Sequence, residues 1–425
     1  MTNVHTDPHT SVSTLPNGVR VVAIALPHLD SVSASVFVRT GSRHESARLN
    51  GISHFAEHMA FKGTHERNCQ QINLDAERLG AEVNAHTDKD HTAYHMRGLA
   101  PHAGRFLHML ADIVRHSTFP EAELERERQV ILQEYAEDED DAFSTAFKLF
   151  DKLCFGTHPL AQPVIGVRRN IERFTRDELM GYVQRQYTGA NVIVAVAGRI
   201  DPYAVVREAE AAFGDMPAGV EHAVPEPGYG GGFAARRQPG VSQTHVVLGF
   251  PLPALRSADH PASQVAAALF GEGMSSPLMD EIRERRGLVY YAACSADVSD
   301  IAGQFVVEAS MAPEHVDEYV DEVMRLLRAH AEAIDPLHLE RARNQLAVRS
   351  LGAEERPFRR IEEAVQDLFV HGRVRPRAEL MAQLRAVSAE QARMAFERML
   401  KARPAIAMAG RVRRPTEERL KALVS

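Results

Sequence analysis

The sequence predicts an α+β protein built from two homologous α/β domains, each a sheet with packed helices, that arose by internal duplication. Three observations support this fold class. The chain has 425 residues, which is too long for one core of ordinary size. A Gly- and Pro-rich stretch divides it near the middle. The second half also repeats segments of the first half in the same order.

The first half opens with two strand-like runs. Apolar and β-branched residues predict strands over 19–25 and 31–38, with a turn near Pro27 between them. Helical segments follow. One of them is opened by Pro120 and has acidic residues in its first turn, as a helix N-terminus prefers.

The division between the halves is marked by a change in composition. From Gly214 the apolar periodicity disappears, and a new strand-like run begins at Thr244. We therefore predict an N-terminal domain over 1–215, a linker over 216–243 and a C-terminal domain over 244–425.

Two pairs of matching segments indicate the duplication. SHFAEHMAF at Ser53 aligns with SQVAAALFG at Ser263, and LERERQVILQE at Leu124 aligns with LERARNQLAVR at Leu339. The flanking apolar positions match, but the chemically active residues differ together. This pattern favours one metal site in the first half and a metal-free copy in the second. In the two pairs of segments, the positions of His54, Glu57, His58, Glu127 and Glu134 are taken in the second half by Gln264, Ala267, Ala268, Ala342 and Arg349.

The motif that carries chemistry is the H-x-x-E-H run from His54 to His58. Histidines four residues apart lie on one helix face, about 5–6 Å apart, and both can reach one zinc ion. Glu57 points toward the same face and can act as base to a water molecule. The same spacing also fits a solvated helix face, and the motif alone leaves both readings open.

A third metal ligand is available in the helix that follows Pro120. Glu127 and Glu134 are two turns apart on one face, so one carboxylate can bind the metal while the other supports it. An ordinary charged helix is the alternative, and we assign that simpler role to Glu125, Arg126, Arg128 and the acidic run 137–141.

The segment HFAEHMAFKGT, followed later by ERERQVILQE, closely resembles the signature of the pitrilysin-type (inverzincin) zinc metallopeptidases. The resemblance continues through GAEVNAHTDKDHTAY, HPLAQPVIG, NVIVAVAGRI and GEGMSSPLMDEIRERRGLVYY. It therefore spans nearly the whole chain. The chain is similar in size to the subfamily that includes mitochondrial processing peptidase and its bacterial homologues.

This resemblance implies the composition of the metal centre. It implies one zinc ion per chain, bound by His54, His58 and Glu134. Glu57 would activate the zinc-bound water as general base, and Glu127 would support the site.

The resemblance also implies how a peptide binds. Asn84 and Ala85 match an element on an edge strand that pairs with the substrate backbone. Arg283 and Tyr290 match residues that the family places across the cleft from the zinc, where both can donate to a carbonyl oxygen that gains charge. Without the resemblance, each residue has a simpler interpretation. Arg283 would belong to a solvated basic helix, and Tyr290 would be a strand residue packed in the core. The two domains would form half of a clamshell around the peptide.

Composition and patterning exclude other classes. The net charge of -8 has the wrong sign for a nucleic-acid-binding protein. No stretch has the length and apolar character of a membrane span, and the N-terminus lacks a secretory signal, so we expect a cytoplasmic protein. His86, His91 and His95 are predicted to be surface or rim histidines, not a second set of ligands.

The sequence thus predicts a zinc metalloendopeptidase that acts on extended peptides or oligopeptides. The alternative is a non-catalytic partner subunit of the same fold in a heterodimeric peptidase. A carboxylate-bridged di-iron bundle fits poorly, because it needs paired Glu-x-x-His motifs. We expect a homodimer, or a heterodimer with a related subunit.

Overall fold

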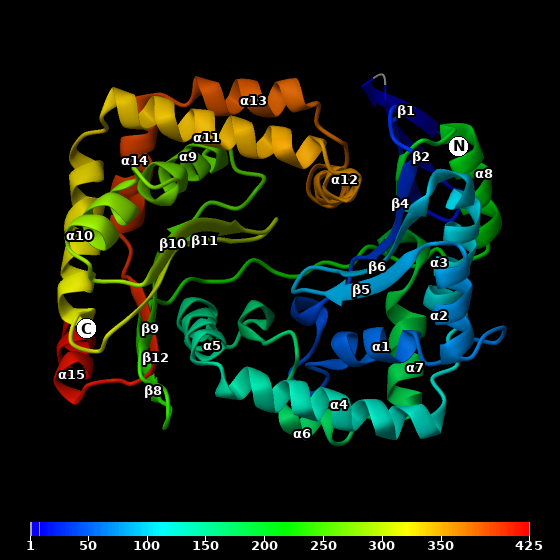
Figure 1. Ribbon diagram of the computed structural model, residues 1–425, viewed down its shortest axis with the longest axis horizontal. Coiled ribbons are helices and arrows are strands. Elements are labelled where there is room, and N and C mark those ends of the chain that lie inside the picture. The colour runs from blue at the N-terminus through cyan, green and yellow to red at the C-terminus, as the bar shows by residue number, and fades with distance from the viewer. Residues whose placement is uncertain (1, 8, 425) are drawn as a thin grey trace. The chain divides into compact units, whose positions relative to one another are not determined.

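The computed structural model describes residues 2–7 and 9–424, which form two compact units (Figure 1). The first unit comprises residues up to 135, 162–224 and 352–376, and the second comprises 136–161, 225–351 and the residues from 377. In the described part of the chain, no helix has both the length and the apolar composition that crossing a membrane requires.

The first unit is a mixed sheet with helices on both faces. Its seven strands are in the order β1-β2-β3-β7-β4-β6-β5. Its elements are β1 (Thr2–Asp7), β2 (Thr10–Thr14), β3 (Arg20–Ala25), β4 (Ser31–Val38), η1 (Ser42–His44), α1 (Ile52–Ala60), α2 (Cys69–Arg78), β5 (Glu82–Thr87), β6 (Thr92–Leu99), η2 (Ala100–His102), α3 (Ala103–His116), α4 (Glu121–Asp140), α6 (Arg168–Ile171), α7 (Arg176–Gln186), η4 (Gly189–Asn191), β7 (Val192–Gly198), α8 (Pro202–Phe213) and α12 (Pro357–His371).

The second unit has a sheet of five strands in the order β10-β11-β9-β12-β8. Its elements are α5 (Ala142–Phe155), η3 (Pro159–Ala161), β8 (Gly232–Arg237), β9 (Thr244–Leu252), α9 (His260–Gly271), η5 (Leu278–Arg285), β10 (Tyr291–Val298), β11 (Gly303–Met311), α10 (Val316–Glu332), α11 (Pro336–Glu354), α13 (Arg377–Ala386), α14 (Ala389–Leu400), β12 (Ala405–Gly410) and α15 (Arg414–Leu423).

Five neighbouring strands of the first sheet, β3 to β5 in the sheet order, repeat the topology of the second sheet, which confirms the predicted duplication. β3 and β7 are parallel, and the other pairs among β5, β6, β4 and β7 are antiparallel. The same directions recur in the second unit, where β8 and β12 are parallel and β10, β11, β9 and β12 pair antiparallel. The central strands β7 and β12 are buried along their whole length, because helices cover both faces of each sheet.

Each sheet is covered on one face by a helix from the other half of the sequence. Helix α12 packs on the first sheet, where Ile361, Val365 and Leu368 join a core with strand residues such as Ile193. Helix α5 packs on the second sheet, where Ala146 and Phe150 join Val247 and Ala407. The units therefore interleave the sequence. The predicted domain boundaries, 1–215, 216–243 and 244–425, describe ranges of the duplicated sequence and not spatial units. They stay a prediction.

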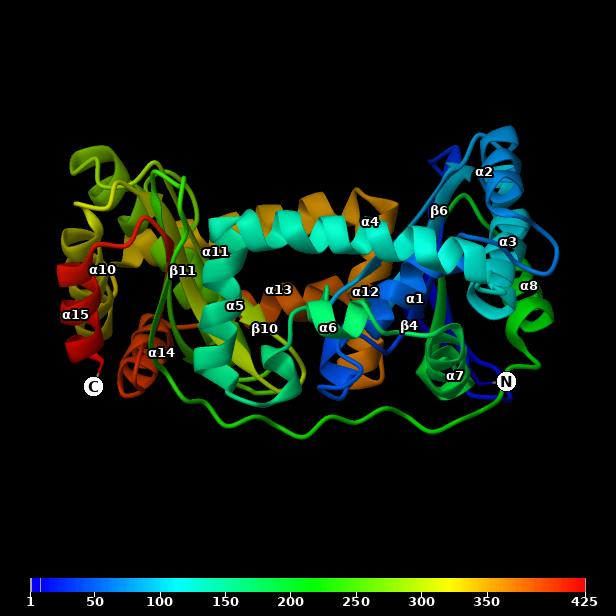
Figure 2. The same cartoon turned by 90° about the horizontal axis from the view of Figure 1, so that it is seen from below.

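The predicted linker contains more structure than its composition suggested. Residues 217–231 form neither helix nor strand (Figure 2), but Gly232–Arg237 form β8, which pairs with β12 at the edge of the second sheet. An edge strand pairs through its backbone and can expose polar side chains, so Arg236 and Arg237 gave no apolar signal.

Candidate metal centre

Helix α1 presents two different faces. Ile52, Phe55 and Met59 are buried in a core with residues of α4 and α7. The opposite face carries His54, Glu57 and His58, all half-buried. The 3.6-residue period of the helix therefore separates the packing residues from the polar ones.

The N-terminus of α1 is held by a buried carboxylate. Glu45, which is 2% exposed, accepts hydrogen bonds from the backbone N–H of Gly51 and of Ser53, both at 2.8 Å. These donors have no intrahelical acceptor, and a negative charge near them is favourable. Gly51 has φ 98°, and a Cβ there would lie 2.9 Å from the Cα of Gly166. The close backbone approach and the left-handed conformation both require glycine.

Three donor atoms converge beside α1. The Oε2 atom of Glu134, on α4, lies 3.7 Å from Nε2 of His54 and 3.5 Å from Nε2 of His58. Helices α1 and α4 lie side by side in both views (Figures 1 and 2). Among the described residues, this is the one group of three His, Cys, Asp or Glu donors that could hold a metal ion, with ligand atoms within 4.8 Å of one another.

The spacing and chemistry of these atoms fit a zinc ion. Ligands at about 2.0–2.2 Å from a tetrahedral zinc are roughly 3.3–3.6 Å apart, close to the separations observed here. Burial and the neighbouring His58 lower the pKa of His54 to about 3, so its imidazole is neutral, as coordination requires. Two imidazoles and one carboxylate are also the donor types of a catalytic zinc site with an open fourth position.

A second carboxylate orients His58. Nδ1 of His58 lies 3.1 Å from Oε2 of Glu127, and Nζ of Lys62 lies 2.7 Å from Oε1 of the same carboxylate. Burial alone would raise the pKa of Glu127, but the hydrogen bonds from His58 and Lys62 outweigh it and the pKa falls below its usual value. An ionised Glu127 can only accept, so Nδ1 of His58 donates and its Nε2 is directed to Glu134.

The local field around His58 is negative. Desolvation lowers the pKa of His58, but the hydrogen bond to Glu127 and the charges of Glu134 and Glu57 outweigh it, so the pKa lies above its usual value. Surroundings that favour a proton on this imidazole equally favour a metal cation beside it.

Glu57 is held by a residue that the sequence did not single out. The hydroxyl of Thr87, on β5, donates to Oε2 of Glu57 at 2.6 Å. Burial raises the pKa of Glu57, the hydrogen bond from Thr87 and the charge of His58 oppose the rise, and Glu134 adds to it. The result is a raised pKa, which suits a carboxylate that takes up and releases a proton.

β5 is an edge strand of the first sheet, as predicted for the strand that carries Asn84 and Ala85. Ala85 packs against the core together with Val83, whereas Asn84 is exposed. The Asn84 side chain accepts a hydrogen bond from the backbone N–H of Ala85 at 2.8 Å. Within the described residues the outer edge of β5 pairs with no other strand, and Thr87 links this strand to Glu57.

Three histidines lie close together, on β5, in the turn that follows it and on β6. His86, His91 and His95 are half-buried, and the ring of His86 lies 5.4 Å from that of His91 and 5.8 Å from that of His95. His95 also contacts Phe358 of α12, with ring centroids 4.8 Å apart. Half-buried side chains are compatible with the predicted surface or rim position, and the contact between His95 and Phe358 shows that α12 covers part of this face of the strands.

Arg283 and Tyr290 belong to the second unit. Arg283 lies on η5, a π-helix, and Tyr290 is 80% exposed directly before β10. The exposure contradicts the alternative in which Tyr290 is packed in a core. The three donor residues His54, His58 and Glu134 all belong to the first unit, so neither Arg283 nor Tyr290 is one of them.

The second unit has different residues where the repeated segments match the metal donors of the first. Arg349, which aligns with Glu134, lies 3.1 Å from a carboxylate oxygen of Glu272. Ala267 and Ala268 are buried and carry no donor atoms.

Two contributors to the site were missed by the sequence reasoning. Lys62 had a signal, since it follows His58 by four residues and so lies on the same side of the chain as it leaves α1. For Thr87 the sequence contains no comparable signal beyond its place three residues after Asn84. Its contact with Glu57 depends on how β5 packs against α1.

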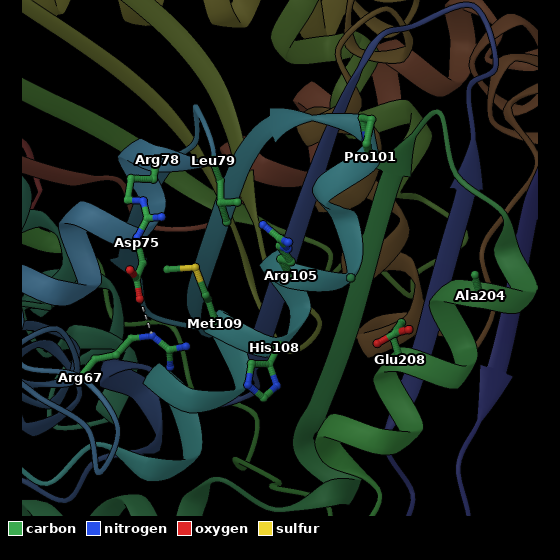
Figure 3. Close-up of a pocket in the computed structure, with 11 residues that line it drawn as sticks. Arg67, Asp75, Arg78, Leu79, Pro101, Arg105, His108, Met109, Ala204 and Glu208 are labelled. Atoms are coloured by element: carbon green, nitrogen blue, oxygen red, sulfur yellow. Dashed lines mark hydrogen bonds and ion pairs between the residues drawn. The ribbon is translucent and has the colours of Figure 1, made fainter.

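The first unit also contains a pocket of about 740 Å³ that is separate from the metal donors. It lies between α2, α3 and α8 (Figure 3). Arg67 is bound there to Asp75 at 3.0 Å and to the buried Asp112 at 2.6 Å. None of His54, His58 and Glu134 lines this pocket, so it is not part of the candidate metal site.

The fold and the donor set define a duplicated α/β protein with a candidate three-donor metal site, and comparisons with known proteins agree with this fold. The family model "Insulinase (Peptidase family M16)" matches residues 20–168, and the model "Peptidase M16 inactive domain" matches residues 173–346. The chain therefore belongs to peptidase family M16, the insulinase or pitrilysin family, which confirms the family predicted from its sequence.

Individual relatives extend this finding along the chain. An "Uncharacterized zinc protease" of Rickettsia felis is 31% identical, over 89% of this chain and 92% of its own. The "Uncharacterized zinc protease YmxG" of Bacillus subtilis is 30% identical over the same shares. The crystal structure of a protease from Helicobacter pylori has the same fold, with a TM-score of 0.88 and 22% identity over 95% of this chain and 100% of that chain.

Proposed function

We propose that this chain is a zinc-dependent peptidase that hydrolyses peptide bonds in extended peptides or oligopeptides. The observation that carries the proposal is the convergence of His54, His58 and Glu134, with Glu57 on the same face of α1. The names of its M16 relatives as zinc proteases support it.

The residues divide the chemistry between them. His54, His58 and Glu134 would hold one zinc ion per chain, and Glu127 would fix the orientation of His58. When bound, zinc supplies a Lewis acid that polarises the scissile carbonyl and acidifies water. Glu57 takes the proton from the attacking water and then delivers it to the leaving amine.

The edge of β5 is the proposed peptide-binding element. An unpaired strand edge can bind an extended peptide through backbone hydrogen bonds, which depend little on the side chains of the peptide. Asn84 and Ala85 would contribute here, and the Asn84 carboxamide would release the Ala85 N–H to a substrate carbonyl. Broad acceptance of peptide sequences follows from this mode of binding.

Arg283 and Tyr290 are proposed to donate hydrogen bonds to the substrate carbonyl oxygen as it gains charge. Loss of one such donor typically costs about 10² to 10³ in turnover. We therefore expect Tyr290→Phe and Arg283→Ala to keep zinc and stability but to lose turnover on this scale, mainly in kcat. Steady-state cleavage of a quenched fluorescent peptide, zinc content and thermal melting test this.

The controls for this prediction are close neighbours. Tyr291 donates to Glu308 at 2.7 Å, and Arg285 is an exposed residue of η5. Tyr291→Phe and Arg285→Ala should retain kcat. Near wild-type turnover in both Tyr290→Phe and Arg283→Ala would place all catalytic groups in the first unit.

The alternative function is that of a non-catalytic partner subunit of the same fold. The presence of all four metal-site groups argues against it, because a subunit without activity has no need for the complete set. A homodimer, or a heterodimer with a related subunit, is proposed as the assembly. Location in the cytoplasm stays a prediction of the sequence.

The experiment that tests the proposed function uses the purified full chain. Metal analysis should find about one zinc per chain, and a mixed-peptide digest read by mass spectrometry should show cleavage that a chelator abolishes and zinc restores. Size-exclusion chromatography of the same sample reports the assembly. A zinc-loaded chain that cleaves no peptide would contradict the peptidase proposal and favour the partner subunit.

A further inference from the structure

We propose that Thr87 is a positioning residue, whose hydroxyl sets the orientation of Glu57 and links that orientation to the edge strand β5. The inference rests on the proposed function, in which Glu57 is the general base. It concerns a residue that neither the metal-binding motif nor the resemblance singled out.

The first observation is the contact itself. Thr87 Oγ1 lies 2.6 Å from Oε2 of Glu57, which is a short hydroxyl-to-carboxylate hydrogen bond. A hydroxyl has one proton to donate, and the neighbouring Thr92 hydroxyl, 3.4 Å away, already donates to the backbone oxygen of Thr40 at 2.8 Å. The Thr87 proton is therefore free for Glu57, and the carboxylate can only accept.

The second observation is the shortage of other partners for Glu57. Its carboxylate is half-buried, and Thr87 is the hydrogen-bond donor that the structure gives it among the described residues. The nearby Glu134 is a like charge that favours displacement. A glutamate has three rotatable side-chain bonds, so without the Thr87 hydroxyl its carboxylate would sample several orientations.

The third observation is the position of Thr87 on the strand. Val83 and Ala85 of β5 pack against the core, and Thr87 continues the same alternation along the strand and contacts Glu57 of α1. The outer edge of this strand is the proposed site of peptide pairing. One rigid strand therefore carries both the peptide backbone and the group that holds the base, so the hydroxyl fixes the spacing between them.

Positioning of this kind acts on turnover more than on binding. A misplacement of about 1 Å in a reacting group can cost roughly 10²-fold in rate. We expect Thr87→Val, which keeps the shape but removes the donor, to lower kcat by about 10- to 100-fold with little change in KM. Thr87→Ser, which keeps the hydroxyl, should restore most of the turnover. If Thr87 only filled space, Thr87→Val would keep the turnover and Thr87→Ser would give no advantage over it.

The control is a threonine with the same chemistry elsewhere. Thr416, in the second unit, is 2% exposed and donates to a carboxylate oxygen of Asp317 at 2.9 Å. Thr416→Val also removes a buried hydroxyl-to-carboxylate hydrogen bond, and it should lower stability without changing kcat. Zinc content should match the wild type in all three variants.

A second readout does not depend on activity. Crystal structures of the zinc-loaded wild type and variants should show the Glu57 carboxylate beside residue 87 in the wild type and Thr87→Ser, and displaced in Thr87→Val. An unmoved Glu57 or an unchanged kcat in Thr87→Val would overturn the inference. If the wild type cleaves no peptide but Glu57 moves in Thr87→Val, the positioning role holds and the peptidase proposal fails.

Discussion

Replacement of Glu57 by glutamine is expected to leave zinc bound and to remove nearly all peptidase activity. The amide has the same shape as the carboxylate but cannot accept the proton of the attacking water. General acid–base groups typically contribute about 10² to 10⁴ in rate, and the loss should fall in kcat. Because the metal is held by His54, His58 and Glu134, its affinity should change little.

The measurement for Glu57→Gln pairs steady-state peptide cleavage with zinc content and thermal melting. The hydrogen bond from Thr87 can pass to the amide oxygen of glutamine, so the fold around residue 57 should persist. Activity close to that of the wild type would show that another group removes the proton. Loss of zinc together with activity would show instead that Glu57 helps to hold the metal.

Removal of any metal ligand is expected to abolish zinc binding altogether. His54→Ala, His58→Ala and Glu134→Ala each leave two donors, and a three-ligand site then loses most of its affinity. Activity should be lost with the metal. A ligand that binds only the folded state raises the melting temperature, so added zinc should stabilise the wild type but none of these variants.

Matched controls separate loss of a ligand from loss of a surface charge. Glu125 is an exposed carboxylate on the same helix as Glu134, and His108 is an exposed histidine on α3. Glu125→Ala and His108→Ala should bind about one zinc per chain, measured by metal analysis after dialysis. Full zinc content in Glu134→Ala would contradict the assignment of Glu134 as a ligand.

The sequence determined the parts of this protein that depend on local pattern. Helical periodicity placed His54, Glu57 and His58 on one face of α1, because residues three and four apart are neighbours on a helix. Runs of apolar and β-branched residues predicted the strands that became β3 and β4. The repeated segments predicted two domains of one topology, and the family comparison confirmed them.

Only the tertiary structure decided the contacts between segments far apart in the chain. The bond between Thr87 and Glu57 depends on the packing of β5 against α1, and the support of α1 by Glu45 depends on a turn that folds back to its N-terminus. The exchange of α5 and α12 between the sheets is of the same kind. Each helix has an apolar face that any apolar sheet surface could cover, so amphipathic pattern shows that the face is buried but not against which sheet.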